Sequence, residues 1–326
     1  MQLRAREALI DSDANFDPQQ LLVAYRNLQK KSERYGSFLT EQHLMTVMTS
    51  ATQLLSAHRI VVKIGSALIA DGETGHIRGP WLETMIEDVV RFFARGQQVI
   101  IVTSGAVAAG FCHFNDSDSP LRNEDRKAAA AIGQVRLMLA FEQSLKRFGF
   151  GLGQLLLTGE DLRNSHRRIN IWLTVRRILQ VGALPVINEN DTTATIETCV
   201  GDNDRLAAHL AELLQADILI LLSNIDGLFT EDPNNNPSAR LITKVRRITP
   251  RIEAMASHSH SRHSSGGMLT KLMAARIAMN AGYNMIIAKG NKSYPLSAIE
   301  NGGPSTWFVP STSDRTDCDM YADNLS

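Results

Sequence analysis

From Ile60 onward, the chain alternates short, unbroken apolar runs with longer amphipathic segments, and this alternation restricts its fold more than any other feature. Unbroken apolar runs are typical of strands buried on both faces, and amphipathic segments between them are typical of crossover helices. We predict strands at residues 60–64, 99–102, 153–157, 183–187, 218–222 and 285–288. We predict helices at residues 81–95, 128–146, 170–181 and 206–214. The pattern indicates an α/β fold, a largely parallel sheet with helices on both faces.

The chain is expected to have three parts. Residues 1–57 carry apolar side chains at helical spacing and no recognisable chemistry, so we predict an N-terminal helical extension used for packing or self-association. Residues 58–310 hold the alternating pattern and are expected to form the main domain. Residues 311–326 are polar and are expected to form a C-terminal tail.

Composition excludes several classes of function. Lys+Arg and Asp+Glu both number 34, so no net charge favours nucleic acid or an anionic membrane as partner. No apolar run is long enough to cross a membrane, and no leader sequence is apparent. Cys112, Cys199 and Cys318 lack metal or redox spacing, and nothing near the first two would activate a thiol. We therefore expect a cytoplasmic protein with unreactive cysteines.

The most polar part of the sequence surrounds one predicted strand end and one predicted helix start. Asn188-Glu-Asn-Asp191 follows the strand at 183–187, and Gly201-Asp-Asn-Asp204 precedes the helix at 206–214. In an open α/β sheet, ligands bind at the carboxyl ends of the strands. Solvated loops rich in turn-forming residues are the alternative interpretation, and the other strand ends decide between the two.

Two of those strand ends carry groups suited to an anion. Lys63 lies inside the first predicted strand and Gly65 follows it, which places an ammonium group beside backbone that a ligand can approach closely. This is not a Walker loop, because the lysine precedes the glycine. Ser104 ends the second strand and is expected to cap the next helix, whose free N–H groups suit a carboxylate. The small residues at 105–110 permit close approach to either a helix or a small substrate.

Two later segments suit a nucleotide. Ser223 and Asn224 end a fully apolar run, and their hydroxyl and carboxamide groups suit a ribose, a base edge or a phosphate. Gly266-Gly267 can present backbone N–H groups to a phosphate. Lys271 falls in the first turn of the helix that follows, where a cation opposes the helix dipole, so we expect an anion nearby.

Two lysines, a group of carboxylates and a nucleotide-suited strand end together indicate phosphoryl transfer. That chemistry requires alignment of the reactants and neutralisation of charge on the moving phosphoryl group. Lys63 and Lys271 would repel each other unless a carboxylate lay between them, and Asp204 is the natural candidate. Mg²⁺ would act on the remaining phosphate oxygens.

The motifs in this order resemble those of the glutamate 5-kinases, a branch of the amino-acid kinase family. They are Val-Val-Lys-Ile-Gly-Ser, Val-Thr-Ser-Gly-Ala-Val-Ala-Ala-Gly, Lys-Ala-Ala-Ala-Ala-Ile-Gly-Gln, Leu-Leu-Leu-Thr, Asn-Glu-Asn-Asp, Gly-Asp-Asn-Asp-Arg-Leu-Ala and Gly-Gly-Met-Leu-Thr-Lys. The resemblance runs from about residue 60 to residue 308. It implies an amino-acid-kinase-like αβα sandwich and ATP-dependent phosphorylation of the L-glutamate γ-carboxylate, the first step of proline biosynthesis.

The resemblance also implies residue roles. Lys63, Lys271 and Asp204 look catalytic, with Asp204 orienting the two lysines. The residues that resemble the glutamate site are Ser104, Asn188, Asp191, Asp202 and Asn203. Those that resemble the nucleotide site are Lys63, Gly65, Ser223, Asn224, Ser265, Gly266, Gly267, Met268, Leu269, Thr270 and Lys271. Mg²⁺ is expected to be carried by ATP rather than by a protein cage.

Further partners follow from the same resemblance: proline as a possible feedback inhibitor, a separate γ-glutamyl phosphate reductase, and a second copy of the chain in a homo-oligomer. A segment of the chain also resembles the kinase half of pyrroline-5-carboxylate synthase. No RNA-binding-like domain is expected after residue 310. His258, His260 and His263 lack a second ligand set, so a mobile loop near the nucleotide is favoured over a metal site.

The sequence departs from the family pattern at two places. Asn224 stands where the family usually has Asp, and Ser264-Ser265 stand where Gly-Thr is common. Asn224 keeps the hydrogen-bonding capacity of Asp but loses its charge, so we expect nucleotide affinity or metal preference to differ from that of the family. Two alternatives therefore remain open: a kinase acting on aspartate or N-acetylglutamate, and a non-catalytic protein that senses glutamate or proline.

Overall fold

The computed structural model describes residues 52–114, 122–195, 200, 202–257 and 267–310. The predictions for most of the N-terminal extension, the C-terminal tail, Ser265, Gly266, Cys199 and the histidine cluster lie outside these residues. Within them, no helix is long and apolar enough to cross a membrane. Leu54 and Ala57 are buried, and the Gln97 side chain donates hydrogen bonds to both of their carbonyl oxygens, so the residues just before position 58 pack onto the domain.

An eight-stranded sheet forms the centre of the molecule, in the order β3-β4-β2-β1-β5-β7-β8-β6. All neighbouring strands pair in parallel except β7 and β8, which are antiparallel. The strands are β1 Arg59–Ile64, β2 Gln98–Val102, β3 Gly151–Leu157, β4 Ala183–Glu189, β5 Ile218–Ser223, β6 Lys244–Val245, β7 Asn284–Lys289 and β8 Ser305–Phe308.

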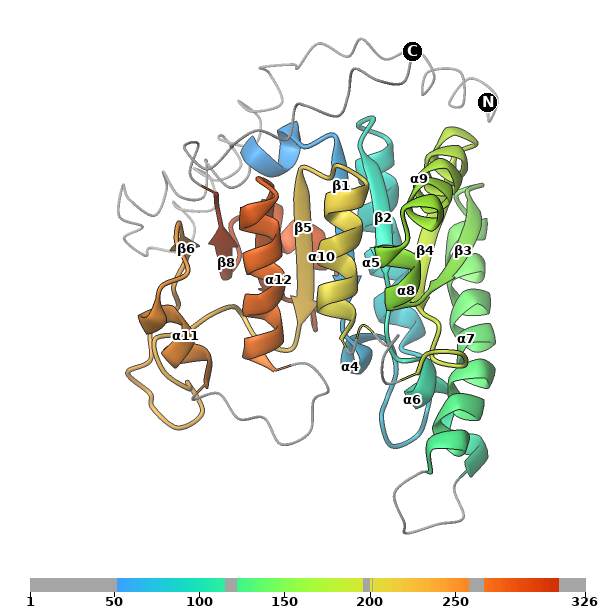
Figure 1. Ribbon diagram of the computed structural model, residues 1–326, viewed down its shortest axis with the longest axis horizontal. Helices are drawn as coiled ribbons and strands as arrows, with labels where there is room; N and C mark the ends of the chain where they lie inside the picture. Colours follow the sequence, from blue (N-terminus) through green and yellow to red (C-terminus); the bar gives the residue numbers. More distant parts are fainter. Residues whose placement is uncertain (1–51, 115–121, 196–199, 201, 258–266, 311–326) are drawn as a thin grey trace.

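Helices cover both faces of this sheet, which makes an αβα sandwich (Figure 1). On one face, Met85 of α5, Leu137 of α7 and Leu296 of α13 join the apolar cluster around Val62. Helices α9, α10 and α12 pack on the other face, against the side of β1 that carries Val61. The helices are α4 Ser66–Ile69, α5 Gly79–Phe93, α6 Ala106–Gly110, α7 Asn123–Lys146, α8 Gly159–Arg163, α9 Ser165–Gln180, α10 Asn203–Leu213, α11 Pro250–Ser257, α12 Met268–Asn280 and α13 Pro295–Glu300, with a 3₁₀ turn at Phe111–Phe114.

The predicted fold class is confirmed, and each predicted strand and helix is present with ends shifted by a few residues. The alternation of Val61 and Val62 between the two cores explains why the strands read as unbroken apolar runs: both faces of the sheet are buried. Strands β6 and β8 were not predicted from the sequence. They have only two and four residues, too few for a periodic signal.

Small residues bring α6 and α7 into backbone contact. A Cβ atom built on Gly110 would lie 1.9 Å from the carbonyl oxygen of Ala129, and one built on Gly133 would lie 1.8 Å from that of Ala106. The sequence left open whether the small residues at 105–110 face a helix or a substrate. At Gly110 the neighbour is the helix α7.

Replacing Gly133 by alanine is therefore expected to push the two helices apart and to lower the free energy of unfolding by about 1–3 kcal/mol. Urea denaturation of Gly133→Ala measures this loss. Gly72→Ala is the matched control, because no described residue lies within 4 Å of a Cβ built at Gly72. Equal stability of the two variants would show that the helix contact is not tight in solution.

Candidate active site

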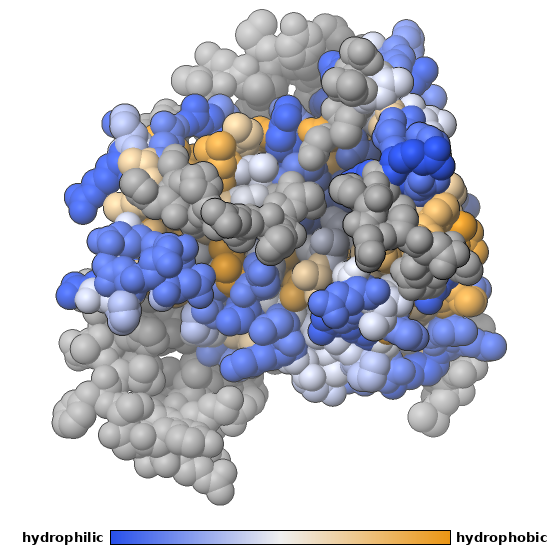
Figure 2. All heavy atoms as spheres, turned by 90° about the horizontal axis from the view of Figure 1, so that it is seen from below, coloured by the Kyte–Doolittle hydropathy of each residue, from blue (hydrophilic) through white to orange (hydrophobic). Residues whose placement is uncertain are grey.

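The carboxyl ends of the parallel strands lie along one edge of the sheet, the lower edge in Figure 1. Strand β1 pairs with β2 on one side and with β5 on the other, so the strand order changes direction at β1. Strands that diverge in this way leave a crevice at their carboxyl ends, where α/β proteins bind ligands. Figure 2 views the molecule from this edge, where hydrophilic side chains occupy much of the visible surface.

Two lysines meet one buried aspartate at this edge. Lys63 lies in β1, Lys271 in the first turns of α12, and Asp204 at the start of α10. The Lys63 Nζ atom lies 2.5 Å from Asp204 Oδ1, and the Lys271 Nζ atom donates a hydrogen bond of 3.0 Å to Asp204 Oδ2. The three residues are 7%, 5% and 0% exposed. A single carboxylate therefore separates two ammonium groups inside the protein.

The charges in this triad depend on one another. Burial favours the neutral form of Asp204, but attraction and hydrogen bonds from Lys63 and Lys271 outweigh it and hold the pKa of that carboxyl below its ordinary value. The anion expected near Lys271 from the helix dipole is thus present within the protein, as Asp204. Two positive charges against one negative charge leave the triad with an excess positive charge, which suits a phosphoryl group.

A set of amide side chains lies next to the triad. Asn203 precedes Asp204 at the start of α10, and its Nδ2 atom lies 2.9 Å from each of three acceptors: the carbonyl oxygen of Thr103, Ser104 Oγ and Asn188 Oδ1. The predicted capping role of Ser104 is wrong. The residue before α6 is Gly105, whose left-handed backbone (φ 87°) makes the turn, and no side chain caps that helix. The Ser104 hydroxyl instead bonds to Asn203.

Two acidic residues shape the loop that leads into α10. Asp202 caps the helix, because its Oδ1 atom accepts a hydrogen bond of 3.0 Å from the backbone N–H of Asp204. Glu189 is the last residue of β4, which extends further than predicted, and its Oε1 atom accepts a bond of 2.6 Å from the backbone N–H of Val200. Burial, and then the negative charge of Glu189, raise the pKa of Asp191 to about 6.

The predicted nucleotide residues that the structure describes lie around the ends of β1 and β5 and the start of α12. The backbone N–H of Gly65 bonds to the carbonyl oxygen of Leu222, so β1 and β5 stay paired up to the edge. Ser223 is buried and its hydroxyl lies 3.3 Å from Asn224 Oδ1. Among the residues that the structure describes, none lies within 4 Å of a Cβ built at Gly267.

The rest of that segment is divided between the core and the surface. Met268 is buried, whereas Leu269 is 49% exposed. Thr270 donates a hydrogen bond of 2.8 Å to the carbonyl oxygen of Gly267, and its hydroxyl lies 3.4 Å from Asp204 Oδ2. The start of α12 is therefore tied to the lysine triad by both Thr270 and Lys271.

The donor set near the triad does not form a protein cage for a metal ion. Across the described ranges, no three His, Cys, Asp or Glu side chains are grouped closely enough to hold one. Both oxygens of Asp204 already face lysines. The described residues near the triad therefore offer a divalent cation no complete set of protein ligands.

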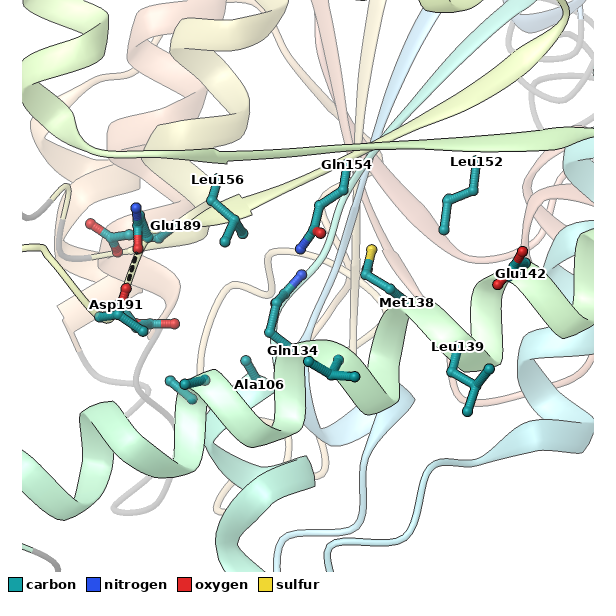
Figure 3. Close-up of a pocket in the computed structure, with 15 residues that line it drawn as sticks. Ala106, Gln134, Met138, Leu139, Glu142, Leu152, Gln154, Leu156, Glu189 and Asp191 are labelled. Carbon is teal, nitrogen blue, oxygen red and sulfur yellow. Dashed lines mark hydrogen bonds between the residues drawn. The ribbon is translucent and has the colours of Figure 1, made fainter.

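Sequence reasoning missed two buried residues of this site. Glu189 received no role, and Gln134 was noted only as part of a motif. Gln134 lies on α7, and its Oε1 atom accepts a hydrogen bond of 2.9 Å from Asn188 Nδ2. It lines a cavity of about 520 Å³ together with Glu189 and Asp191 (Figure 3). No local signal marks it, because a glutamine within an Ala-rich helix looks like an ordinary surface residue.

A parallel sheet with two lysines held across a buried carboxylate at its ligand-binding edge is the framework of a phosphoryl-transferring enzyme. Residues 58–289 match the model of the amino acid kinase family. The chain is 69% identical over 262 residues to "Glutamate 5-kinase 2" of Mesorhizobium japonicum, covering 80% of this chain and 92% of that relative. It therefore belongs to the amino acid kinase family and, within that family, to the glutamate 5-kinases.

A further relative agrees with this assignment, and two solved structures share the fold. "Glutamate 5-kinase" of Paramagnetospirillum magneticum is 49% identical over 263 residues, which are 81% of this chain and 71% of that protein. UMP kinase from Ureaplasma parvum shares the fold with a TM-score of 0.52 at 15% identity, covering 77% of this chain and 98% of that one. Carbamate kinase from Giardia lamblia has a TM-score of 0.54 at 14% identity, covering 79% and 100%.

Proposed function

We propose that this chain transfers the γ-phosphoryl group of ATP to the γ-carboxylate of L-glutamate. The observation that carries the proposal is the Lys63–Asp204–Lys271 triad, in which two buried ammonium groups share one carboxylate. Phosphoryl transfer between two oxygens spreads negative charge over the moving group, and fixed cations on either side stabilise that charge. The membership in the glutamate 5-kinases supplies the acceptor.

Each member of the triad has a separate task in this mechanism. Lys63, at the end of β1, and Lys271, at the start of α12, approach the transferred group from different elements and neutralise its oxygens. Asp204 touches no reacting atom in this scheme; it keeps the two ammonium groups apart and in place. Because the cations are positioned before the substrate arrives, little reorganisation is needed in the transition state.

Glutamate would bind at the ends of β2 and β4. Ser104, Asn188, Asp191, Asp202 and Asn203 are the residues proposed for it, and hydrogen bonds to Asn203 link two of them directly. Carboxamide groups can bind the α-carboxylate, whereas carboxylates such as Asp191 can bind the α-ammonium group. This arrangement would direct the γ-carboxylate toward the triad.

ATP would bind across the ends of β1 and β5 and the start of α12. The residues proposed for it are Lys63, Gly65, Ser223, Asn224 and residues 265–271. Mg²⁺ bound to the nucleotide phosphates would supply further neutralisation of their charge. No described residue lies within 4 Å of a Cβ built at Gly267, and the backbone N–H groups at the start of α12 suit an anion.

The test is trapping of the acyl phosphate. With ATP, Mg²⁺, L-glutamate and hydroxylamine, the protein is expected to form γ-glutamyl hydroxamate, and ADP should appear only when glutamate is present. Aspartate and N-acetylglutamate, supplied in parallel, are expected to give no product. Absence of hydroxamate alongside an active control kinase would refute the proposal, and saturable glutamate or proline binding without turnover would instead indicate a sensing protein.

The raised pKa of Asp191, about 6, predicts an acidic limit for glutamate use. The α-ammonium group requires the ionised carboxylate, which exists above that pKa, so kcat/KM for glutamate should fall up to tenfold per unit below about pH 6. Bound ammonium favours the ionised form, so kcat should begin to fall at a lower pH than kcat/KM. Asp191→Asn should remove this limb; a wild-type profile that stays flat to pH 5 would contradict the assignment.

We also propose that two copies associate through the β3 edge of the sheet. Strand β3 has a single paired neighbour, β4, among the described residues, and an unpaired edge strand can pair with its own copy about a two-fold axis. Exposed apolar side chains flank it: Val135 and Leu139 on α7, which are 69% and 52% exposed, and Leu173 on α9, which is 49% exposed. Sedimentation should show a dimer or tetramer that Leu139→Glu dissociates. A monomeric wild-type protein would refute this.

The remaining assignments follow from the same membership. We propose a cytoplasmic location, transfer of γ-glutamyl phosphate to a separate reductase, and inhibition by proline, which resembles glutamate in its α-carboxylate. The residues 58–310 are proposed to carry the whole site, with residues 1–57 as an extension and 311–326 as a tail.

A further inference from the structure

Gln134 holds a buried hydrogen-bond donor that has no acceptor among the residues that the structure describes. Its side chain is 7% exposed, and its Nε2 atom is buried without a partner. It projects from α7 into the cavity that Asp191 also lines, toward Gln154 on β3 (Figure 3). Buried N–H groups in native proteins nearly always have an acceptor, so this atom requires an explanation.

The orientation of the Gln134 amide is fixed by backbone groups. Asn188 Oδ1 accepts a hydrogen bond of 2.9 Å from the backbone N–H of Glu189, which can only donate. The Asn188 Nδ2 atom must therefore be the group that faces Gln134, and the group that receives its bond is Gln134 Oε1. The Gln134 Nε2 atom is consequently left over as a donor, whichever way the amides were first assigned.

Gln134, Asn188 and Asn203 form a chain of hydrogen-bonded amides, and acceptors are left unused at its Asn203 end. Asn203 Nδ2 donates to the backbone carbonyl oxygen of Thr103, which can only accept, so Asn203 Oδ1 is fixed as an acceptor. Asn203 Oδ1 and Asp202 Oδ2 are both buried and have no partner in the described part of the chain. An unused donor on one side of Asn188 can bind a carboxylate, and two unused acceptors on the other side can bind an ammonium group. Together they suit the two charged groups of an amino acid.

We propose that Gln134 is a substrate-binding residue that selects the α-carboxylate of glutamate. Its Nε2 atom donates to that carboxylate, while Asn203 Oδ1 and Asp202 Oδ2, together with Asp191, accept from the three N–H groups of the α-ammonium. Its Oε1 atom also orients Asn188, and through it Asn203. This inference rests on the proposed function and adds the group that distinguishes an α-carboxylate from a neutral group.

The experiment pairs an enzyme substitution with a substrate substitution. Gln134→Glu keeps an oxygen for Asn188 but replaces the donor by an acceptor. The second substrate is the α-carboxamide of glutamate, which keeps the α-ammonium and γ-carboxylate groups but replaces one α-carboxylate oxygen by NH₂ and removes the negative charge. Hydroxamate formation gives kcat and KM for both substrates and the KM for ATP.

The wild-type protein is expected to prefer glutamate over the α-carboxamide by about 10²-fold in kcat/KM, because the carboxamide lacks the negative charge and one of the two oxygens that a buried donor can bind. In Gln134→Glu this preference should fall at least tenfold, mainly through KM, with the KM for ATP unchanged. Gln143→Glu is the matched control, since Gln143 lies exposed on the same helix. Its preference should equal that of the wild type.

If Gln134 only orients Asn188, kcat/KM will fall equally for glutamate and for its α-carboxamide. The preference for glutamate will then not change, which overturns the inference. A Gln134→Glu protein with wild-type constants overturns it too. Should that variant unfold, Gln134→Met removes the donor without adding charge, and the preference is again expected to fall. Failure of the wild-type protein to phosphorylate glutamate would refute the proposed function instead, so the two failures are distinguishable.

Discussion

Lys271→Ala is expected to lower kcat for glutamate-dependent ATP turnover about 10³-fold or more, with a much smaller change in the KM for glutamate. Cations placed on a transferring phosphoryl group are typically worth about 10³–10⁵ in rate, because the charge they neutralise is greatest in the transition state. The loss should not come from unfolding. Asp204 keeps Lys63 as its partner in this variant, and removing Lys271 also removes a cation from the start of α12.

Steady-state kinetics and thermal unfolding of the same preparations separate these effects. Lys244→Ala is the matched control, since Lys244 is an exposed lysine on β6, and it should keep wild-type kcat. Lys271→Arg is expected to restore little activity, because a planar guanidinium group does not replace a compact ammonium group in a buried position. Retention of more than a tenth of wild-type kcat by Lys271→Ala would exclude the proposed role of Lys271 in phosphoryl transfer.

Asp204→Asn should produce the largest loss of stability of any substitution at the site. The change leaves Lys63 and Lys271 buried without a countercharge, and removing one member of a buried ion pair costs about 3–5 kcal/mol. For a chain of this size the melting temperature should fall by roughly 10 °C. Activity should fall as well, because the two ammonium groups would repel each other and lose their positions.

A double substitution tests whether the loss comes from the unpaired charge. Lys63→Met added to Asp204→Asn removes one of the stranded cations, so the double variant should be more stable than the sum of the two single effects. Glu83→Gln removes an exposed carboxylate from α5 and should change the free energy of unfolding by less than about 0.5 kcal/mol. Simple additivity of Lys63→Met and Asp204→Asn would show that the triad is not electrostatically coupled.

The sequence predicted the central sheet and the triad for the same reason. Unbroken apolar runs such as residues 218–222 require burial on both faces, and polar residues at the ends of parallel strands must meet at one edge. Lys63 and Asp204 are 141 positions apart, yet their places at a strand end and a helix start brought them together. The opposite charges of their side chains, ammonium and carboxylate, are known from the sequence alone.

Features that depend on the path of the backbone were not predictable. Ser104 looked like a helix cap, but the left-handed turn at Gly105 removes it from the start of α6 and directs its hydroxyl to Asn203. Gln134 had no local signal, because its importance arises from Asn188 on a different element. Short strands such as β8 are held by pairing with β7, and pairing leaves little trace in four residues.

The backbone contact between α6 and α7 limits how substrate specificity can change among related proteins. Gly133 packs against the backbone of Ala106 and is followed directly by Gln134, so the residue that sets the distance between α6 and α7 adjoins the residue that we propose to bind glutamate. Because the two helices meet through backbone atoms, with no side chains between them that could repack, α7 cannot move closer to α6. The Gln134 amide therefore cannot move back to admit a longer substrate unless the backbone contact between α6 and α7 is lost. Changes of specificity in this protein should accordingly arise from exchange of the amide itself, and seldom from movement of the helix that carries it.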